Sequence, residues 1–265
     1  MAYLYETHLH TSQSSGCGKS RGHEYVKRYL DLGYTGIIIT DHFYHGNCAV
    51  DRSLPWDKWV NKFCRGYEDA REEGERRGLD VFFGWEETFD GDDYLIYGLD
   101  REWLLEHPEC RSWSRQEQFE EVRNYGGCVV HAHPFRQYYY IHCISLFTET
   151  VDAVEAANSG NEQSFDVLAW AYAKKLGLPV TAGSDIHYVE DVRPYTVFGV
   201  YLDRKMKTIA DYSNAIRNNT IAGLNVPSDR FTVLGNEKTI LPVEIKDSHD
   251  RIIGKDLAEF LYTRR

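Results

Sequence analysis

Histidines and carboxylates recur in this sequence beside short apolar runs. His8 and His10 follow the run YLY, and residues i and i+2 of a strand point to the same face. Two imidazoles on one face can bind a transition metal or simply lie side by side at a surface. Comparable groups stand at the ends of later apolar runs: Asp41 and His42, Glu86 and Glu87, His131 and His133, and Asp185 and His187. Asp92 and Asp93 precede a further apolar run.

This repetition predicts a metal centre. One Asp-His pair after a strand is typical of a hydrogen-bonded turn, but several such groups at equivalent strand ends indicate a shared site. Imidazole with carboxylate suits zinc, iron or manganese, and a carboxylate can bridge two ions. Thiolates are mostly absent from the groups, which argues against a structural zinc knot. A serine hydrolase and a phosphate loop are both disfavoured, because no Gly-x-Ser-x-Gly elbow occurs and SSGCGKS lacks the first required glycine.

Alternating strands and helices must position these residues. Apolar runs predict strands at 2–6, 36–40, 81–86, 94–99, 127–133, 151–158, 179–183 and 196–202, and amphipathic runs predict helices at 22–33, 57–77, 114–125, 162–176 and 209–218. This order favours parallel strands with right-handed crossovers, closed or nearly closed into an α/β barrel whose chemistry lies at the C-terminal strand ends. We expect residues 1–225 to form the catalytic barrel and residues 226–265 to be an appendix packed on it.

Composition limits the partners. The formal net charge of −11 argues against a nucleic-acid binder, although nucleotides and other small phosphorylated substrates stay compatible with it. The sequence has no run of 18 apolar residues, so no membrane span is predicted. The N-terminus has no signal-peptide pattern. Six cysteines without a Cys-x-x-Cys pair favour free thiols and a cytoplasmic location. The oligomeric state stays open.

The ordered motifs resemble those of the polymerase and histidinol phosphatase (PHP) family. They are His8-x-His10, Thr40-Asp41-His42, Gly84-x-Glu86, His133-Pro134-x-Arg136 and Gly183-Ser184-Asp185-x-His187, and the resemblance covers residues 3 to 220 approximately. It implies a distorted seven-stranded (β/α) barrel similar to a TIM barrel, with two or three divalent metal ions (manganese, iron or zinc) at the C-terminal strand ends. It also implies hydrolysis of phosphate esters.

The resemblance further implies a ligand set. A first ion would be held by His8, His10, Glu86 and Asp185; Glu86 would bridge to a second ion at His133; and His42 and His187 would hold a third. Asp41 would be either a ligand or a partner that orients an imidazole.

Two positions depart from the family pattern. In the loop after the first motif, where many relatives have an aspartate or histidine ligand, this chain has Ser15, Gly16 and Cys17. Cys17 could coordinate, or the third ion could be weakly bound or lost. Before the fourth strand, where some relatives have a histidine, Asp93 is the expected ligand, and a carboxylate favours manganese or iron somewhat over zinc.

The expected reaction is attack of a metal-activated water on the phosphorus of a small phosphorylated metabolite. The residues expected to act in it are Asp41, His42, Arg136 and His187 as catalytic groups, and Lys19, Arg21, Arg136 and Asn158 as substrate-binding groups. Arg136 could instead pair with an acidic neighbour, and Asn158 could be a loop cap. The run RQYYYIH could be a packed aromatic patch or a wall for a flat or sugar-like substrate. Hydrolysis of a non-phosphate bond such as an amide, and metal binding without catalysis, are the alternatives.

Overall fold

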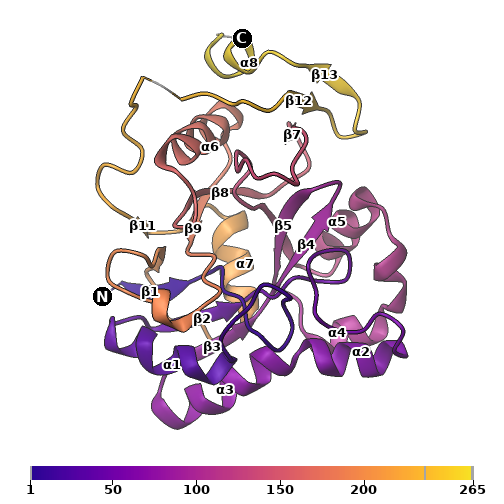
Figure 1. Ribbon diagram of the computed structural model, residues 1–265, viewed down its shortest axis with the longest axis vertical. Coiled ribbons are helices and arrows are strands. Elements are labelled where there is room, and N and C mark those ends of the chain that lie inside the picture. Colours follow the sequence, from indigo (N-terminus) through magenta and orange to yellow (C-terminus); the bar gives the residue numbers. More distant parts are fainter. Residues whose placement is uncertain (1, 236, 264–265) are drawn as a thin grey trace.

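The computed structural model describes residues 2–235 and 237–263, which form a mixed α/β fold with three sheets (Figure 1). One five-stranded sheet has the order β11 (Gly223–Asn225), β10 (Gly199–Leu202), β1 (Tyr3–Glu6), β2 (Gly36–Ile39) and β3 (Asp80–Phe83). The other has the order β4 (Trp85–Phe89), β5 (Asp92–Tyr97), β6 (Cys128–His131), β8 (Ala153–Asn158) and β9 (Val180–Gly183). A smaller sheet contains β13 (Ile252–Gly254), β12 (Val243–Lys246) and β7 (Ile144–Phe147).

Two seams join the five-stranded sheets. Isolated parallel bridges pair Leu9 with Ile186, beyond β1 and β9, and His42 with Glu86, between β2 and β4. A backbone hydrogen bond from Gly84 to Ile39 (2.9 Å) adds to the second seam. The described strands are thus divided among three sheets, whereas the sequence predicted one closed barrel. The seams still bring the ends of both large sheets to one place.

Strand direction differs from the sequence prediction. Parallel pairing throughout was wrong, because β4 with β5, β5 with β6, and β1 with β10 are antiparallel. The cause for the first pair is the two-residue turn Asp90-Gly91, whose φ values of 54° and 90° are those of a type I′ hairpin. A strand predicted over 81–86 is divided at Gly84 into β3 and β4, and a Cβ there would lie 2.9 Å from the Ile96 carbonyl oxygen.

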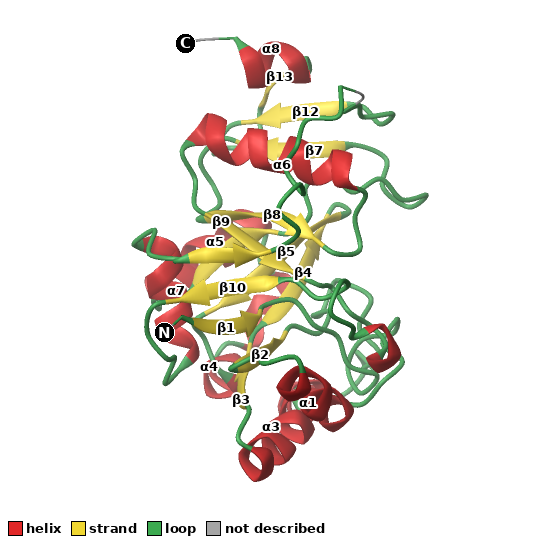
Figure 2. Cartoon of the chain, turned by 90° about the vertical axis from the view of Figure 1, so that its left-hand side faces the viewer, coloured by secondary structure: helices red, strands yellow, loops and turns green. Residues whose placement is uncertain are grey.

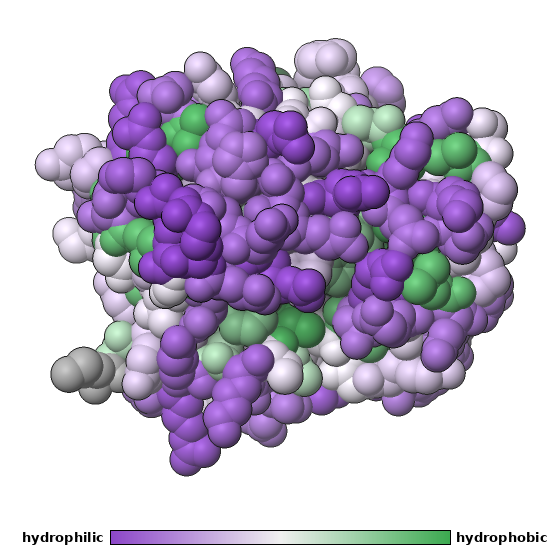
Figure 3. All heavy atoms as spheres, turned by 90° about the horizontal axis from the view of Figure 1, so that it is seen from below, coloured by the Kyte–Doolittle hydropathy of each residue, from purple (hydrophilic) through white to green (hydrophobic). Residues whose placement is uncertain are grey.

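Eight α-helices are present in the described residues. They are α1 (Gly22–Asp31), α2 (Trp56–Phe63), α3 (Arg65–Arg77), α4 (Arg101–Glu106), α5 (Arg115–Asn124), α6 (Gln163–Leu176), α7 (Ile209–Arg217) and α8 (Leu257–Tyr262). The single helix predicted over 57–77 is interrupted at Cys64. A Cβ on Gly22 would meet the Gly66 carbonyl oxygen at 2.1 Å, so glycine permits the close approach of α1 and α3. The face of the molecule that carries α1 and α3, seen from below in Figure 3, is mainly hydrophilic with small separate apolar patches.

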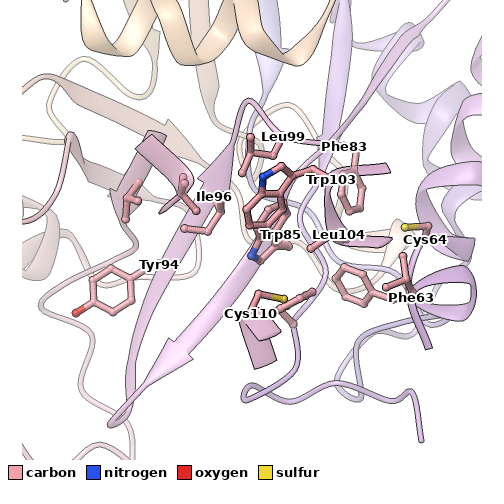
Figure 4. Packing of buried hydrophobic residues seen from close by; sticks show 14 of the residues in the cluster. Phe63, Cys64, Phe83, Trp85, Tyr94, Ile96, Leu99, Trp103, Leu104 and Cys110 are labelled. Atoms are coloured by element: carbon pink, nitrogen blue, oxygen red, sulfur yellow. The ribbon is translucent and has the colours of Figure 1, made fainter. Parts of the chain in front are cut away.

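An aromatic core anchors the strand that carries Glu86. The Trp85 side chain is fully buried, with its ring 6.0 Å from that of Trp103 and 5.9 Å from that of Phe83 (Figure 4). Neighbouring residues on a strand point to opposite faces. Burial of Trp85 in this core therefore directs Glu86 to the other face.

The C-terminal segment extends the fold at the end opposite α1 and α3 (Figures 1 and 2). β12 pairs in parallel with β7, and Phe260 of α8 packs on Tyr172 of α6. The run FTVLG (231–235) has a pattern typical of a strand but forms none. β7, β11 and β13 were not predicted. The division into 1–225 and 226–265 stays a prediction. No described helix combines the length and the apolar character needed to cross a membrane.

Candidate metal centre

The strand ends converge on a compact group of imidazoles and carboxylates. Three overlapping sets have ligand atoms within 4.8 Å of one another: His8, Glu86 and His133; His8, His10 and Asp185; and His10, His42 and His187. They include all the ligands expected from the sequence apart from Asp93. The residues come from the ends of β1, β2, β6 and β9 and from within β4. The position of these groups in the chain therefore predicted their meeting in space.

Glu86 lies at the middle of the group. Its Oε1 is 3.3 Å from the Nε2 atoms of both His8 and His133. Its Oε2 is 2.8 Å from His42 Nδ1 and 3.4 Å from His10 Nε2. Each carboxylate oxygen thus faces a different pair of imidazoles, as a carboxylate shared between two ions would.

The unsatisfied atoms fit a bound cation. Glu86 Oε2 and His42 Nδ1 are both buried, and neither has a hydrogen-bond partner among the described residues, although they lie close together. A buried carboxylate oxygen without a partner is costly unless a cation or a donor compensates it. Burial raises the pKa of Glu86, but charge on His42 and His8 outweighs this effect and holds it well below its ordinary value. An ionised carboxylate among imidazoles is a donor set suited to divalent transition metals.

His10 and Asp185 form the adjoining part of the centre. His10 Nε2 lies 3.1 Å from both His8 Nε2 and Asp185 Oδ1. Burial lowers the pKa of His10, and charge on His187 and His42 lowers it further, which favours the neutral, metal-binding imidazole. Asp185 has a φ of 56° and His133 a φ of 30°, a region of backbone strain that concentrates at functional sites.

Glu155 orients His8, and the sequence analysis missed it. This fully buried residue of β8 accepts from His8 Nδ1 (3.0 Å), the His133 backbone N–H (3.2 Å) and Asn158 Nδ2 (2.9 Å). Because a carboxylate oxygen accepts, His8 donates from Nδ1, and this contact directs its Nε2 toward the centre. The available signal was a glutamate inside the otherwise apolar run AVEAA.

Ser15 and Asp41 orient His10 as Glu155 orients His8. Asp41 accepts from the Thr11 N–H (2.6 Å), the Thr11 hydroxyl (2.7 Å) and the Ser15 hydroxyl (2.6 Å). The Ser15 oxygen also lies 3.1 Å from His10 Nδ1 and 3.0 Å from the His42 backbone nitrogen. Because the single serine proton goes to Asp41, His10 Nδ1 must donate, and its Nε2 is free. Of the two roles open for Asp41, the geometry matches the orienting one.

A cavity of about 610 Å³ opens over the centre. The residues along it include His42, Glu86, His133, Asp185 and His187, together with Cys17, Asp93, Arg136 and Tyr138 to Tyr140. Tyr138 and Tyr140 stack at 5.9 Å, and Tyr139 is 92% exposed, so these rings form a wall of the cavity rather than a packed patch. Another cavity, of about 690 Å³, lies beside α3 and contains none of the expected ligands.

Arg136 is held by the protein at the rim of the metal centre. Its Nη1 lies 2.5 Å from Asp185 Oδ2, which is the acidic partner left open in the sequence analysis. Its Nη2 and Nε donate to the side-chain oxygens of Asn158 (2.8 Å) and Asn161 (2.9 Å). Asn158 is fully buried, so in this structure it positions Arg136. A direct contact of Asn158 with substrate stays a prediction.

The remaining candidates lie farther from the centre. Asp93 accepts from the Thr88 hydroxyl (2.6 Å), and its Oδ2 is 4.0 Å from His133 Nε2. Lys19 is exposed, and Arg21 lies beside the other cavity; neither is among the described residues that line the cavity over the centre. Their contact with phosphate stays a prediction.

His131 and Glu87 face away from the cavity. His131 is buried against Tyr94, and burial, then charge on His133 and Arg115, lowers its pKa to about 3. The Glu87 carboxylate accepts from Gln118 Nε2 (3.1 Å).

Known proteins share parts of this description. A family model described as PHP-associated matches residues 167–221. Among solved structures, the chain is similar to a two-domain protein from Bacteroides vulgatus ATCC 8482 containing a predicted PHP-like metal-dependent phosphoesterase, with a TM-score of 0.57 and 14% identity. That likeness covers 83% of this chain and 64% of the other, so the chain spans less than two thirds of its neighbour's length.

Two further structures are similar at lower scores. One is a candidate metal-dependent phosphoesterase from Bifidobacterium adolescentis ATCC 15703 (TM-score 0.45, 18% identity, 69% of this chain and 87% of that chain). The other is an amidohydrolase from Chromobacterium violaceum with bound sulfate and no metal (TM-score 0.46, 15% identity, 80% of this chain and 96% of that chain). No curated protein matches the chain.

Proposed function

We propose that this chain, whose motifs resemble those of the PHP family and whose residues 167–221 match a PHP-associated family model, is a PHP-type metal-dependent hydrolase of phosphate esters. Its substrate in this proposal is a small phosphorylated metabolite. The observation that carries the proposal is Glu86, a buried carboxylate with one oxygen toward His8 and His133 and the other, unpartnered, toward His42. This arrangement suits a centre of at least two divalent ions open to a cavity.

The bound ions would acidify a water and neutralise phosphate oxygens. The chain's own residues prepare the centre for this chemistry. Glu155 and Ser15 keep protons on the outer nitrogens of His8 and His10, which leaves the inner nitrogens available to ions. The metals proposed are manganese, iron or zinc, with Asp93 as a further carboxylate at the edge.

Arg136 has unused donors at the rim of the cavity. Each terminal nitrogen of its guanidinium makes one hydrogen bond in the protein, to Asp185 or to Asn158, and keeps a second N–H. We assign these free N–H groups to a substrate phosphate, which a planar guanidinium can bind with two parallel hydrogen bonds. The net charge of −11 repels an anionic substrate, so a fixed cation such as Arg136 is needed to bind it.

Two broader expectations belong to the same proposal. The two five-stranded sheets, joined at their seams, would correspond to the distorted seven-stranded barrel of the family. The compartment we propose is the cytoplasm, because all six cysteines are free thiols.

A substrate screen with defined metals tests the function. The protein would be stripped of metal, reloaded separately with manganese, iron and zinc, and assayed against phosphate esters, including histidinol phosphate and nucleotides, and against a panel of amides. We expect metal-dependent phosphate release. Amide hydrolysis without phosphate release would overturn the choice of bond, and metal binding without either activity would favour a binding module.

A further inference from the structure

We propose that Arg230, in the segment between β11 and β12, is a positioning residue for Arg136 and thereby for phosphate binding beside the metal centre. It acts through Asp166 of α6 and through the turn formed by residues 158–161. This inference rests on the proposed function, in which Arg136 binds a substrate phosphate. It goes beyond that function by giving the C-terminal segment, expected from the sequence to be an appendix, a part in the site.

The segment that carries Arg230 runs past α6 (Figure 1). The ring of Phe231 stacks on that of Trp170, with 4.3 Å between the ring centroids. Gln163 Nε2 donates to the Asp229 carbonyl oxygen (2.7 Å), on the other side of Arg230 in the sequence. Arg230 is therefore held inside the fold, and its side chain is only 14% exposed.

The Arg230 guanidinium makes three hydrogen bonds to the adjoining turn and helix. Its Nε donates to Asp166 Oδ2 (2.7 Å), and its Nη2 donates to the backbone carbonyl oxygens of Asn158 (2.9 Å) and Asn161 (2.8 Å). Asp166 is fully buried, and its Oδ2 also accepts from the Asn158 backbone N–H (2.9 Å). Arg230 and Asp166 thus hold the backbone of the two residues whose side chains hold Arg136.

Asp166 also determines which way the Asn161 amide faces. Its Oδ1 accepts from Asn161 Nδ2 (2.9 Å). Burial raises the pKa of Asp166 to about 6, but the charge on Arg230 opposes this effect and favours the ionised form. Because an ionised carboxylate only accepts, Asn161 turns its amide nitrogen toward Asp166 and its oxygen toward Arg136 Nε (2.9 Å).

This turn supplies two of the three side-chain hydrogen bonds that fix Arg136 among the described residues. Asn161 accepts from Nε and Asn158 from Nη2, while Nη1 lies against Asp185. Without the two asparagine contacts, the guanidinium could swing about its contact with Asp185. A guanidinium binds phosphate with two parallel hydrogen bonds only when its plane has the right orientation. Loss of Arg230 should therefore weaken phosphate binding although Arg230 does not touch the phosphate.

Phosphate titration of matched variants tests the inference. Inorganic phosphate would be titrated calorimetrically into the metal-loaded, full-length wild type, Arg230→Met and Arg123→Met. Arg230→Met should keep its metal and bind phosphate roughly 10-fold more weakly, the cost of losing about one hydrogen bond to a charged group. Arg123→Met is the control and should keep the wild-type affinity. Arg123 also pairs with a carboxylate, that of Asp152 (2.9 Å), and with a backbone carbonyl oxygen, but no described hydrogen bond joins it to the turn.

A double-mutant cycle separates positioning from a purely structural role. In protein that already carries Arg136→Ala, Arg230→Met should not weaken phosphate binding further, because the group that it positions is gone. Arg230→Lys keeps a charge opposite Asp166 but lacks the planar fork, so it should recover only part of the affinity. If Arg230→Met does not fold, Arg230→Lys takes its place in the cycle, with a smaller loss in the same direction.

Three results would each overturn the inference. They are wild-type phosphate affinity in the folded Arg230 variant used in the cycle, an equal loss of affinity in Arg123→Met, and an equal loss with and without Arg136. The proposed function would still stand in these cases if the wild type hydrolyses phosphate esters. A wild-type protein that has bound metal but neither binds phosphate nor hydrolyses a phosphate ester would overturn both.

Discussion

Glu86 and Glu87 are neighbours on one strand with opposite surroundings. Glu86 faces the imidazoles of His8, His42 and His133, whereas Glu87 accepts from Gln118 on the other side of β4. Glu86→Gln should remove both ions and lower catalytic efficiency by orders of magnitude, because a neutral amide cannot bridge two cations. Glu87→Gln should keep the metal and cost about 1–3 kcal/mol of stability at most, since it perturbs a buried hydrogen bond. Elemental analysis and denaturation curves measure the two effects, and equal metal loss in both variants would contradict the opposite orientations of Glu86 and Glu87.

Ser15 offers a second test at a residue that does not touch an ion. Ser15→Ala removes the acceptor for His10 Nδ1 and should weaken metal binding by roughly 10- to 100-fold, as loss of an orienting partner typically does. Ser14→Ala is the matched control, because the buried Ser14 hydroxyl donates to the Phe63 carbonyl oxygen (2.6 Å) and makes no hydrogen bond to an expected ligand among the described residues. Metal titration of both variants distinguishes orientation from packing. A similar loss of affinity in Ser14→Ala would argue against the Asp41–Ser15–His10 connection.

These residues also show how far the sequence predicted the centre. Groups such as Glu86 and Asp185 could be found because each ends or follows an apolar run that predicts a strand. Residues at equivalent ends of neighbouring strands lie close together in the fold. Glu155 could not be assigned in the same way, because its contact with His8 joins positions 147 residues apart. Only the folded structure shows which residue of β8 faces His8. Cys17 was named from its place in the chain as a possible ligand of the ion expected at His42 and His187, and all three residues line the same cavity in the structure.

At the scale of elements, the turn between β4 and β5 decides the direction of the second sheet. Gly91 has a φ of 90°, and the Asp-Gly pair is a common signal for a two-residue hairpin, one that the assumption of parallel strands overlooked. Gly91→Ala should destabilise the protein by about 1–2 kcal/mol, the cost of a Cβ in left-handed backbone. Gly223→Ala, where the nearest atom would be 3.9 Å away and φ is ordinary, should be close to neutral. Equal stabilities of the two variants in urea denaturation would contradict this account of the hairpin.

At the scale of the whole molecule, the centre ties both large sheets together. His8 and His42 follow strands β1 and β2 of the first five-stranded sheet. Glu86, His133 and Asp185 belong to or follow strands β4, β6 and β9 of the second. Ions that bind only the folded chain stabilise it by mass action, about 2.7 kcal/mol for each ion at a concentration one hundred times its dissociation constant. Chelation should therefore lower the Tm, and readdition of metal should restore it. A Tm unaffected by chelation in a protein that had contained metal would show that the ions do not link the sheets.

The overall architecture was predicted in part. Buried runs such as GIIIT and the helix that ends at Gly177 were predicted closely, because hydrophobic periodicity and a terminal glycine fix them locally. The short strands β7, β11 and β13 escaped notice, since three or four residues carry too little pattern. Parallel pairing of β12 with β7 depends on contacts between positions 99 residues apart, such as Ile144 and Val243, which no local signal reports.

The most direct test of the central claim is an anomalous difference map from crystals of the protein equilibrated with zinc or manganese. The account predicts separate peaks on the two sides of the Glu86 carboxylate, one beside His10 and Asp185 and the other beside His133. A single peak that does not contact Glu86, or no peak at these residues, would contradict it.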